Sequence, residues 1–201
     1  MEITTLADLR RLYASPVERA VKKQIAHLDI HCRNFIALSP FVVVATADAG
    51  YKVDASPRGG APGFVKVTDE HTLLIPDSPG NNRLDTFENI VATGRVGLIF
   101  MIPGFNETLR VNGTAVLSRS PDDIALCTTE RRVPPLVVRV SVEAAYLHCA
   151  KALLRSQLWS AQSHVDRACL PSAGQMLSDQ TGIHTAPETQ EQMRARYAPD
   201  L

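Results

Sequence analysis

The sequence predicts an α+β protein whose central part is a barrel of antiparallel strands. Three observations support this fold class. Seven short segments rich in apolar and β-branched residues lie between residues 41 and 142, loops rich in glycine, proline and asparagine separate them, and one segment of helical periodicity interrupts them. The length of 201 residues fits one domain with additions at both ends.

A helical arm is expected before the barrel, over residues 1–38. The run at residues 15–18 places a serine at an N-cap position, a proline at the first helical position and a carboxylate at the third. This capping box predicts a helix that extends to about His27. Asp29 is expected to cap a second short helix that continues through Ala37.

The strand candidates belong to the central domain, which we place at residues 39–145. The first, residues 41–46, is mainly β-branched and leads into the turn signal Asp48-Ala49-Gly50, which predicts a hairpin. The other candidates are residues 52–56, 64–67, 72–76, 96–102, 109–117 and 137–142.

Helical periodicity interrupts the strands at residues 79–93. Leu84, Phe87, Ile90 and Val91 recur there every three or four residues, as on the buried face of one helix. A shorter helix is expected after Pro121, where proline can occupy the first helical position.

The segment after the barrel, residues 146–201, is interpreted as a C-terminal helix and tail that pack on the barrel or on a second subunit. Apolar residues recur at helical spacing over residues 144–159, which predicts a helix there. Beyond residue 163 proline, glycine, serine and glutamine dominate, which is typical of an extended tail.

Charge and cysteine content exclude several classes of function. Lysine plus arginine and aspartate plus glutamate each total 21, so no net charge attracts nucleic acid or an anionic membrane. The four cysteines are far apart and form no CxxC pair, which disfavours a clustered zinc site and a disulfide framework. No apolar leader or membrane-spanning segment is visible. We therefore expect a cytoplasmic protein without a metal, a membrane or a nucleic-acid partner.

The first candidate site is the strand exit that contains Ser56, Pro57, Arg58 and Gly59. Glycines beside a serine and an arginine leave backbone N–H groups accessible and add a planar cation, a combination that suits a phosphate or a conjugated carbonyl system. An ordinary strand-to-loop exit with a surface arginine explains the same residues.

The second candidate site is the loop that leads into the helix at residues 79–93. Arg83 is expected in the first turn of this helix, where a cation is unfavourable because the helix dipole is positive there. A bound anion at this position would explain Arg83 and the amide donors of Asn81 and Asn82. Asparagines that simply cap the helix are an equally strong interpretation.

Arg110 is the third candidate. Strand alternation places Leu109 and Val111 on one face and Thr108, Arg110 and Asn112 on the other, so Arg110 can reach a ligand if its face lines the mouth of the barrel. An exposed strand face that ends in an Asn-Gly turn accounts for the pattern equally well.

The predicted C-terminal helix carries Lys151, Arg155 and Trp159 four residues apart and therefore on one side. This side could close over an aromatic, anionic cofactor, although a solvated helix face has the same pattern. His148 and Cys149 are adjacent and would point in different directions on a helix, which disfavours a nucleophile pair.

Taken together, these segments resemble the pyridoxamine 5′-phosphate oxidase-like family of FMN-binding proteins, in particular a bacterial FMN-dependent branch of about this length. The resemblance covers nearly the whole chain and depends on the order and spacing of several motifs. They are Asp54-Ala55-Ser56-Pro57-Arg58-Gly59, Pro62-Gly63-Phe64, Ile75-Pro76-Asp77, Pro79-Gly80-Asn81-Asn82-Arg83, Ile102-Pro103-Gly104, Glu107-Thr108-Leu109-Arg110-Val111-Asn112-Gly113, His148-Cys149-Ala150-Lys151-Ala152 and Leu170-Pro171-Ser172-Ala173-Gly174-Gln175-Met176.

The resemblance implies a split β-barrel that forms a homodimer and holds each FMN with residues of both subunits. It also implies that basic residues of the strand-to-helix loop bind the phosphate, and Asn82 and Arg83 occupy that place. The pyridoxamine phosphate oxidases carry an Arg-Lys pair there, so this chain has one cation fewer, and Arg58, Arg110 and Lys151 are the candidates to supply it. The chain also lacks their C-terminal Trp-Gly and arginine segment, which disfavours vitamin B6 oxidation.

Three functions follow from this interpretation. The first is an FMN-dependent oxidoreductase that acts on a small-molecule redox substrate, which the sequence leaves unidentified together with any catalytic residue. The second is a flavin-binding protein that stores or carries FMN without turnover. The third is a haem-binding relative on the same barrel. The residues expected to bind the cofactor are Ser56, Pro57, Arg58, Gly59, Asn81, Asn82, Arg83, Arg110, Lys151 and Trp159.

Overall fold

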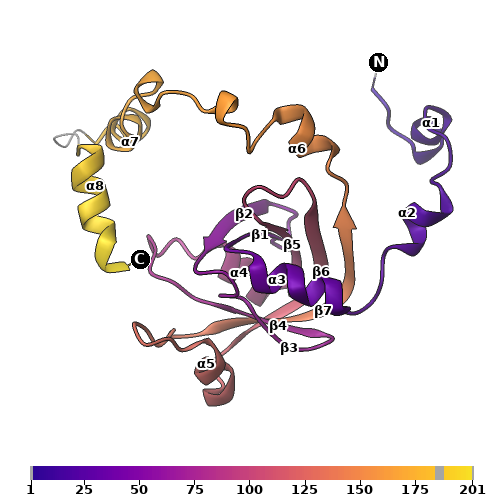
Figure 1. The fold of residues 1–201 in the computed structure, drawn as a ribbon, viewed down its shortest axis with the longest axis horizontal. Helices are drawn as coiled ribbons and strands as arrows, with labels where there is room; N and C mark the ends of the chain where they lie inside the picture. Colours follow the sequence, from indigo (N-terminus) through magenta and orange to yellow (C-terminus); the bar gives the residue numbers. More distant parts are fainter. Residues whose placement is uncertain (1, 184–187, 201) are drawn as a thin grey trace.

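The computed structural model describes residues 2–183 and 188–200. In this part of the chain one antiparallel sheet of seven strands, ordered β2-β1-β5-β6-β7-β4-β3, curls into a split barrel and confirms the predicted α+β fold (Figure 1). The strands are β1 (Phe41–Ala47), β2 (Val53–Gly59), β3 (Lys66–Asp69), β4 (Thr72–Pro76), β5 (Arg95–Met101), β6 (Thr108–Ser118) and β7 (Val137–His148).

The core lies between the inner face of this sheet and two helices, α3 (Ile30–Leu38) and α4 (Asp85–Thr93). Alternate residues of each strand point inward, so the sheet contributes Val42, Val44 and Phe100, each at most 2% exposed. Ile36 of α3 and Ile90 of α4 pack against the same cluster. The hairpin predicted at residues 48–50 joins β1 to β2.

The start of α3 confirms the predicted cap. Oδ1 of Asp29 accepts a hydrogen bond from the backbone N–H of Cys32 at 2.8 Å. This hydrogen bond to the ionised carboxylate keeps the pKa of Asp29 below its ordinary value. Helix α4 begins later than predicted, and only part of its expected apolar face is buried: Phe87 and Ile90 lie in the core, whereas Leu84 and Val91 are exposed.

The helix predicted from residue 15 to His27 is mostly wrong. The N-terminal arm instead contains two short helices, α1 (Leu6–Arg11) and α2 (Glu18–Lys22), and the N-cap of α2 is Val17, which has no side-chain cap. The chain is extended again at Ile25, which exchanges backbone hydrogen bonds of 3.1 and 2.7 Å with Ala145. Pairing with the sheet therefore ends the helix early.

The helix predicted over residues 144–159 is also wrong at its start. Strand β7 continues to His148, because β6 pairs with it along its whole length, with Leu109 opposite Leu147 and Thr108 opposite His148. The helix that follows is α6 (Lys151–Ser156), and Gln157 ends it with a left-handed backbone at φ 50°.

The chain beyond α6 extends away from the barrel as a series of short helices, and the N-terminal arm leaves the barrel elsewhere (Figure 1). These C-terminal helices are α7 (Ala173–Thr181), α8 (Gln190–Tyr197) and the 3-10 turns η1 (Ala161–Ser163), η2 (Arg167–Cys169) and η3 (Ala198–Asp200). Within the described residues, no helix is both long and apolar enough to span a membrane.

Helix α5 (Pro121–Cys127) begins at Pro121, as predicted. The carboxylate of Asp123, 6% exposed, attaches it to the barrel by accepting hydrogen bonds from Ser118 at 2.7 Å and from Arg139 at 2.7 Å. These contacts fix α5 against β6 and β7. Cys127 completes a small separate core with Leu74 and Val137.

The dipeptide Asn112-Gly113 does not form the turn that was one interpretation of this segment. Both residues lie inside β6, where the register with β7 shifts by one residue. A Cβ atom on Gly113 would lie 2.0 Å from the carbonyl oxygen of Ser141, so only glycine fits at this β-bulge. The position therefore serves strand packing.

Candidate functional site

The first group of candidate residues lies where strand β2 meets the beginning of helix α4. Ser56 and Arg58 are paired in the sheet with Val44 and Val42, whose side chains are buried in the core, so all four point to the inner face. At this edge of the barrel, Nη2 of Arg58 donates a hydrogen bond to Oγ1 of Thr86, in the first turn of α4, at 3.2 Å.

A carboxylate that was absent from the predicted site lies at the centre of this group. Oδ2 of Asp54 accepts a hydrogen bond from Oγ1 of Thr86 at 2.6 Å, and Ser56 donates to both carboxylate oxygens at 3.1 and 3.0 Å. Thr86 is only 3% exposed, so this contact is part of the packed structure. Asp54, Ser56, Arg58 and Thr86 are called the β2–α4 cluster below.

Arg83 does not lie in the first turn of α4, as was predicted. The helix begins at Asp85, because Leu84 has a left-handed backbone with φ 62°. Asn82 is also left-handed, with φ 60°, and Oδ1 of Asn81 accepts a hydrogen bond from the backbone N–H of Arg83 at 3.1 Å. The left-handed conformation is unfavourable for leucine, and such strain is frequent at functional sites.

Arg83 is paired within its own loop. Its Nε donates to Oδ2 of Asp85 at 2.8 Å, and its side chain is 72% exposed. The hydrogen bond from Arg83 lowers the pKa of Asp85, and the hydrogen bond to Asp85 raises the pKa of Arg83, with a smaller contribution from the charge of Asp54. Arg83 therefore lies within the electrostatic field of the β2–α4 cluster.

Arg110 lies on the opposite face of the sheet. It is paired with Ile99 of β5 and Tyr146 of β7, and its neighbours Leu109 and Val111 are buried in the core, so the predicted alternation is confirmed. Its guanidinium lies 5.4 Å from the centre of the Tyr146 ring. The structure therefore separates Arg110 from Ser56 and Arg58 of the same chain.

Arg110 has a buried donor without a partner, a property that it shares with Arg33 among the described residues. Among the described residues its Nε has no hydrogen-bond acceptor, although this atom is buried. Lys23 of the N-terminal arm lies 5.3 Å from the same Tyr146 ring and donates to the carbonyl oxygen of Leu147 at 2.8 Å. Two cations thus converge on one aromatic ring, an arrangement that an additional anion would stabilise.

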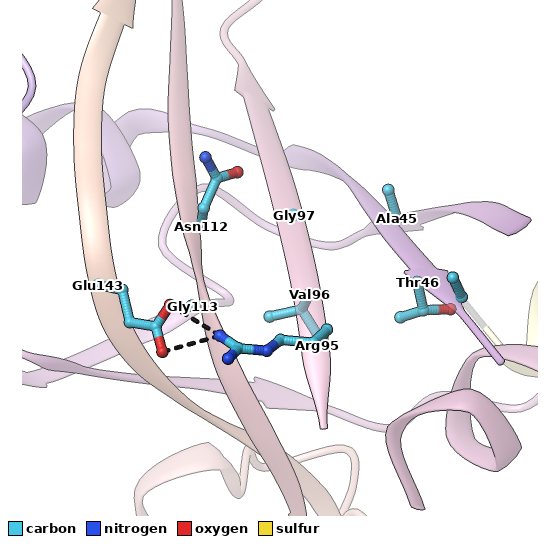
Figure 2. Close-up of a pocket in the computed structure, with 9 residues that line it drawn as sticks. Ala45, Thr46, Arg95, Val96, Gly97, Asn112, Gly113 and Glu143 are labelled. Carbon is cyan, nitrogen blue, oxygen red and sulfur yellow. Dashed lines mark hydrogen bonds and ion pairs between the residues drawn. The ribbon is translucent and has the colours of Figure 1, made fainter. Parts of the chain in front are cut away.

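The outer face also has a hollow of about 310 Å³, whose lining includes Asn112, two residues beyond Arg110 on β6 (Figure 2). Figure 2 shows Arg95 and Glu143 facing one another across its edge, where Nη1 of Arg95 donates to Oε2 of Glu143 at 2.9 Å. Asn112 and the backbone of Gly97 line the hollow beside this ion pair. The small side chains of Ala45 and Ala47 and the absence of a side chain at Gly97 leave room for this hollow.

Lys151 and Trp159 lie on the chain after β7 and not on one helical stripe. Helix α6 ends at Ser156, so Trp159 lies beyond it, and Nε of Arg155 bonds to the carbonyl oxygen of Lys151. Nε1 of Trp159 donates to the carbonyl oxygen of Phe105 at 2.7 Å, which holds the tail against the β5–β6 loop. The predicted alignment of the three residues is wrong.

Three residues of the two groups were missed by the sequence analysis. Asp54 and Thr86 are 32 positions apart, and only the fold brings them together. Tyr146 was assigned to a helix, although its place on β7 opposite Arg110 makes it part of the outer face. The only sequence signal for this position of Tyr146 is the alternation of inward and outward side chains, if the strand is continued past residue 142.

The chemistry available to these groups is anion binding. Arg58, Arg83 and Arg110 are permanently charged donors, and the described residues contain no group of three or more His, Cys, Asp or Glu that could hold a metal ion. Cys32 and Cys127 are buried and Cys149 and Cys169 exposed, and all four are free thiols. Burial raises the pKa of Cys32 to about 12, so this thiol is not a nucleophile at neutral pH.

Comparison with known proteins gives one family and several similar folds. The family model described as pyridoxamine 5′-phosphate oxidase matches residues 28–149. A structure of a HupZ variant from Group A Streptococcus is 18% identical, with a TM-score of 0.50 over 60% of this chain and 99% of that chain.

Two further structures belong to other bacteria. A candidate pyridoxamine 5′-phosphate oxidase from Lactobacillus delbrueckii is 24% identical, with a TM-score of 0.47 over 61% of this chain and 95% of that chain. An FMN-binding protein from Syntrophomonas wolfei is 14% identical, with a TM-score of 0.46 over 58% of this chain and 83% of that chain. A search of curated protein sequences found no match.

Proposed function

Because the chain belongs to the pyridoxamine 5′-phosphate oxidase family, we propose that it is an oxidoreductase that binds FMN between the two subunits of a homodimer. The observation that carries this proposal is the division of its cations between the two faces of the sheet. Arg58 lies on the inner face of β2 and contacts α4, and Arg83 lies in the loop before α4. Arg110 lies on the outer face, and its buried Nε lacks an acceptor.

FMN fits the residues that are present. Its phosphate is an anion that suits the amides of the loop before α4 and the guanidinium groups of Arg58 and Arg83. The Arg110 Nε of a second subunit requires an acceptor, and FMN offers phosphate, hydroxyl and carbonyl oxygens. Lys151 and Trp159 remain proposed contributors from the tail.

The division of labour between cofactor and protein follows from this arrangement. FMN, when bound, supplies the electron-transfer chemistry. The residues of this chain bind and orient the cofactor through hydrogen bonds and charge, and we assign none of them an acid–base role. The proposed substrate is a small redox-active molecule.

The homodimer is proposed on physical grounds. A split barrel has free edges, here at β2 and β3, and its outer face exposes Val53 at 79% and Val116 at 60%. Among the described residues, the helices α1, α2, α6 and α8 bury none of their own side chains. Isolated helices this short are unstable in water, which favours contacts with a second copy.

The test is an absorption spectrum of the purified protein after incubation with FMN and removal of free cofactor. We expect retained flavin bands, and bleaching of these bands by NADH or NADPH under anaerobic conditions. If the protein retains flavin but neither NADH, NADPH nor another electron donor reduces it, the protein is a flavin carrier and not an enzyme. A haem spectrum with no flavin retained would contradict the FMN proposal.

A further inference from the structure

The carboxylate of Asp54 stands where the proposed function places an anion. It accepts hydrogen bonds from the hydroxyl of Thr86, in the first turn of α4, and from the hydroxyl of Ser56, two residues along β2. Helix α4 has no local side-chain cap, since its N-cap residue is Leu84. The first turn of α4 carries Asp85 and Glu88, and Asp54 adds a carboxylate from a different element at this positive end of the helix.

We propose that Asp54 determines specificity as a built-in anion that competes with the ligand phosphate for this end of α4. The inference rests on the proposed function, because it concerns how the same site discriminates between a phosphorylated flavin and the same flavin without phosphate. In the unliganded chain Asp54 stabilises the cluster. In the complex its charge opposes the charge of the phosphate.

The local charges support this competition. Arg58 and Arg83 bring two positive charges, whereas Asp54 and Asp85 bring two negative ones, so these four side chains together are neutral. Asp85 already holds Arg83 in an ion pair at 2.8 Å, and Asp54 contributes to the field at Arg83. When a phosphate binds, the positive charge of the two arginines is therefore already partly neutralised by the two carboxylates.

The hydroxyl groups lead to the same conclusion. Each hydroxyl can donate one hydrogen bond, and both Ser56 and Thr86 donate theirs to the carboxylate of Asp54. Arg58 in turn donates to Oγ1 of Thr86, so its position depends on the same carboxylate. To donate to a phosphate, either hydroxyl must leave Asp54, which reduces the affinity gained from the phosphate group.

The test compares how tightly FMN and riboflavin bind, because they differ only in the phosphate. We expect Asp54→Asn, which removes the charge and keeps the shape, to increase the ratio of riboflavin Kd to FMN Kd about tenfold, as expected for removal of one nearby like charge. Asp54→Glu keeps the charge and changes the shape, so its ratio is expected to stay near the wild-type value. Glu70→Gln removes an exposed charge in the β3–β4 turn and serves as the control.

An unchanged or decreased ratio in Asp54→Asn would overturn the proposal, as would an equal increase in Asp54→Glu. A second readout does not require flavin: the rise in unfolding temperature when chloride is replaced by inorganic phosphate at constant ionic strength. We expect a larger rise for Asp54→Asn than for the wild type, and an equal rise would count against the inference. Failure of wild-type protein to bind either flavin would instead refute the proposed function, and the phosphate readout would still decide the role of Asp54.

Discussion

At the scale of single residues, the sequence analysis singled out the cations of the proposed site but not the residues that they contact. Arg58, Arg83 and Arg110 stand out because they interrupt loops or strands that need no charge for folding. Asp54 and Thr86 were missed, since their contact joins a strand to a helix 32 residues later. Motif patterns report local chemistry, and contacts between distant elements depend on the fold.

Arg83 gives the most direct residue-scale prediction. Arg83→Ala should weaken FMN binding by about tenfold to a hundredfold, the usual range for a lost hydrogen bond to a charged group. Riboflavin lacks the phosphate, so its affinity should change little. Fluorescence titration of both flavins measures the two effects, and an equal loss for riboflavin would show that Arg83 does not bind the phosphate.

The cysteines give a second residue-scale prediction. Cys149 and Cys169 are exposed, whereas burial raises the pKa of Cys32 to about 12 and also raises the pKa of Cys127. Only thiolates react rapidly with iodoacetamide. Mass spectrometry of peptides should therefore find Cys149 and Cys169 alkylated in the folded protein and Cys32 only after unfolding. Early alkylation of Cys32 would contradict the packing of α3.

At the scale of elements, strand segments were predicted better than helices near the ends of the chain. Alternation identified the strands, and the structure extended several of them by a few residues. The helix expected over residues 144–159 failed because pairing with β6 outweighs helical spacing at Tyr146. The cap predicted at Asp29 is confirmed, because a helix cap depends on contacts within four residues of sequence.

The cap of α3 has a pH-dependent effect on stability. Asp29→Ala should lower the free energy of unfolding at neutral pH by about 1 kcal/mol, the usual cost of losing an N-cap. The pKa of Asp29 is lower in the folded protein, so its contribution is present above the unfolded value of about 4 and disappears as the pH falls through the folded value. Denaturation by urea at several pH values measures this effect. A difference between variant and wild type that stays constant down to the lowest pH would be inconsistent with it.

The β-bulge between β6 and β7, where Glu143 of β7 has no partner in the register, gives a second element-scale prediction. Gly113→Ala should destabilise the protein by about 3 kcal/mol, the upper part of the range for overpacking, because its Cβ would lie 2.0 Å from a carbonyl oxygen. Gly80→Ala is the matched control, since its added Cβ would meet its nearest atom at 4.0 Å. Equal unfolding temperatures for the two variants would mean that the bulge is not as tight as described.

At the scale of the whole molecule, the cations of one chain lie on both faces of one sheet. Arg58 on β2 and Arg110 on β6 belong to one sheet, in which β1 and β5 lie between these two strands, yet alternation directs the two side chains to opposite faces. A cofactor contacted by both kinds of residue would therefore lie between two barrels. The sequence predicted the homodimer from a resemblance, and the arrangement of the sheet now supplies a geometric reason for proposing it.

The central claim is that each FMN is bound by Arg83 of one subunit and Arg110 of the other, and subunit exchange tests it most directly. Arg83→Ala and Arg110→Ala are purified separately, mixed in equal amounts, unfolded and refolded together, and titrated with FMN. In a mixed dimer one site carries both substitutions and the other carries none. The account predicts that about a quarter of all sites recover wild-type affinity, as random pairing requires. The absence of any wild-type site in the mixture, with both variants folded and dimeric, would contradict it.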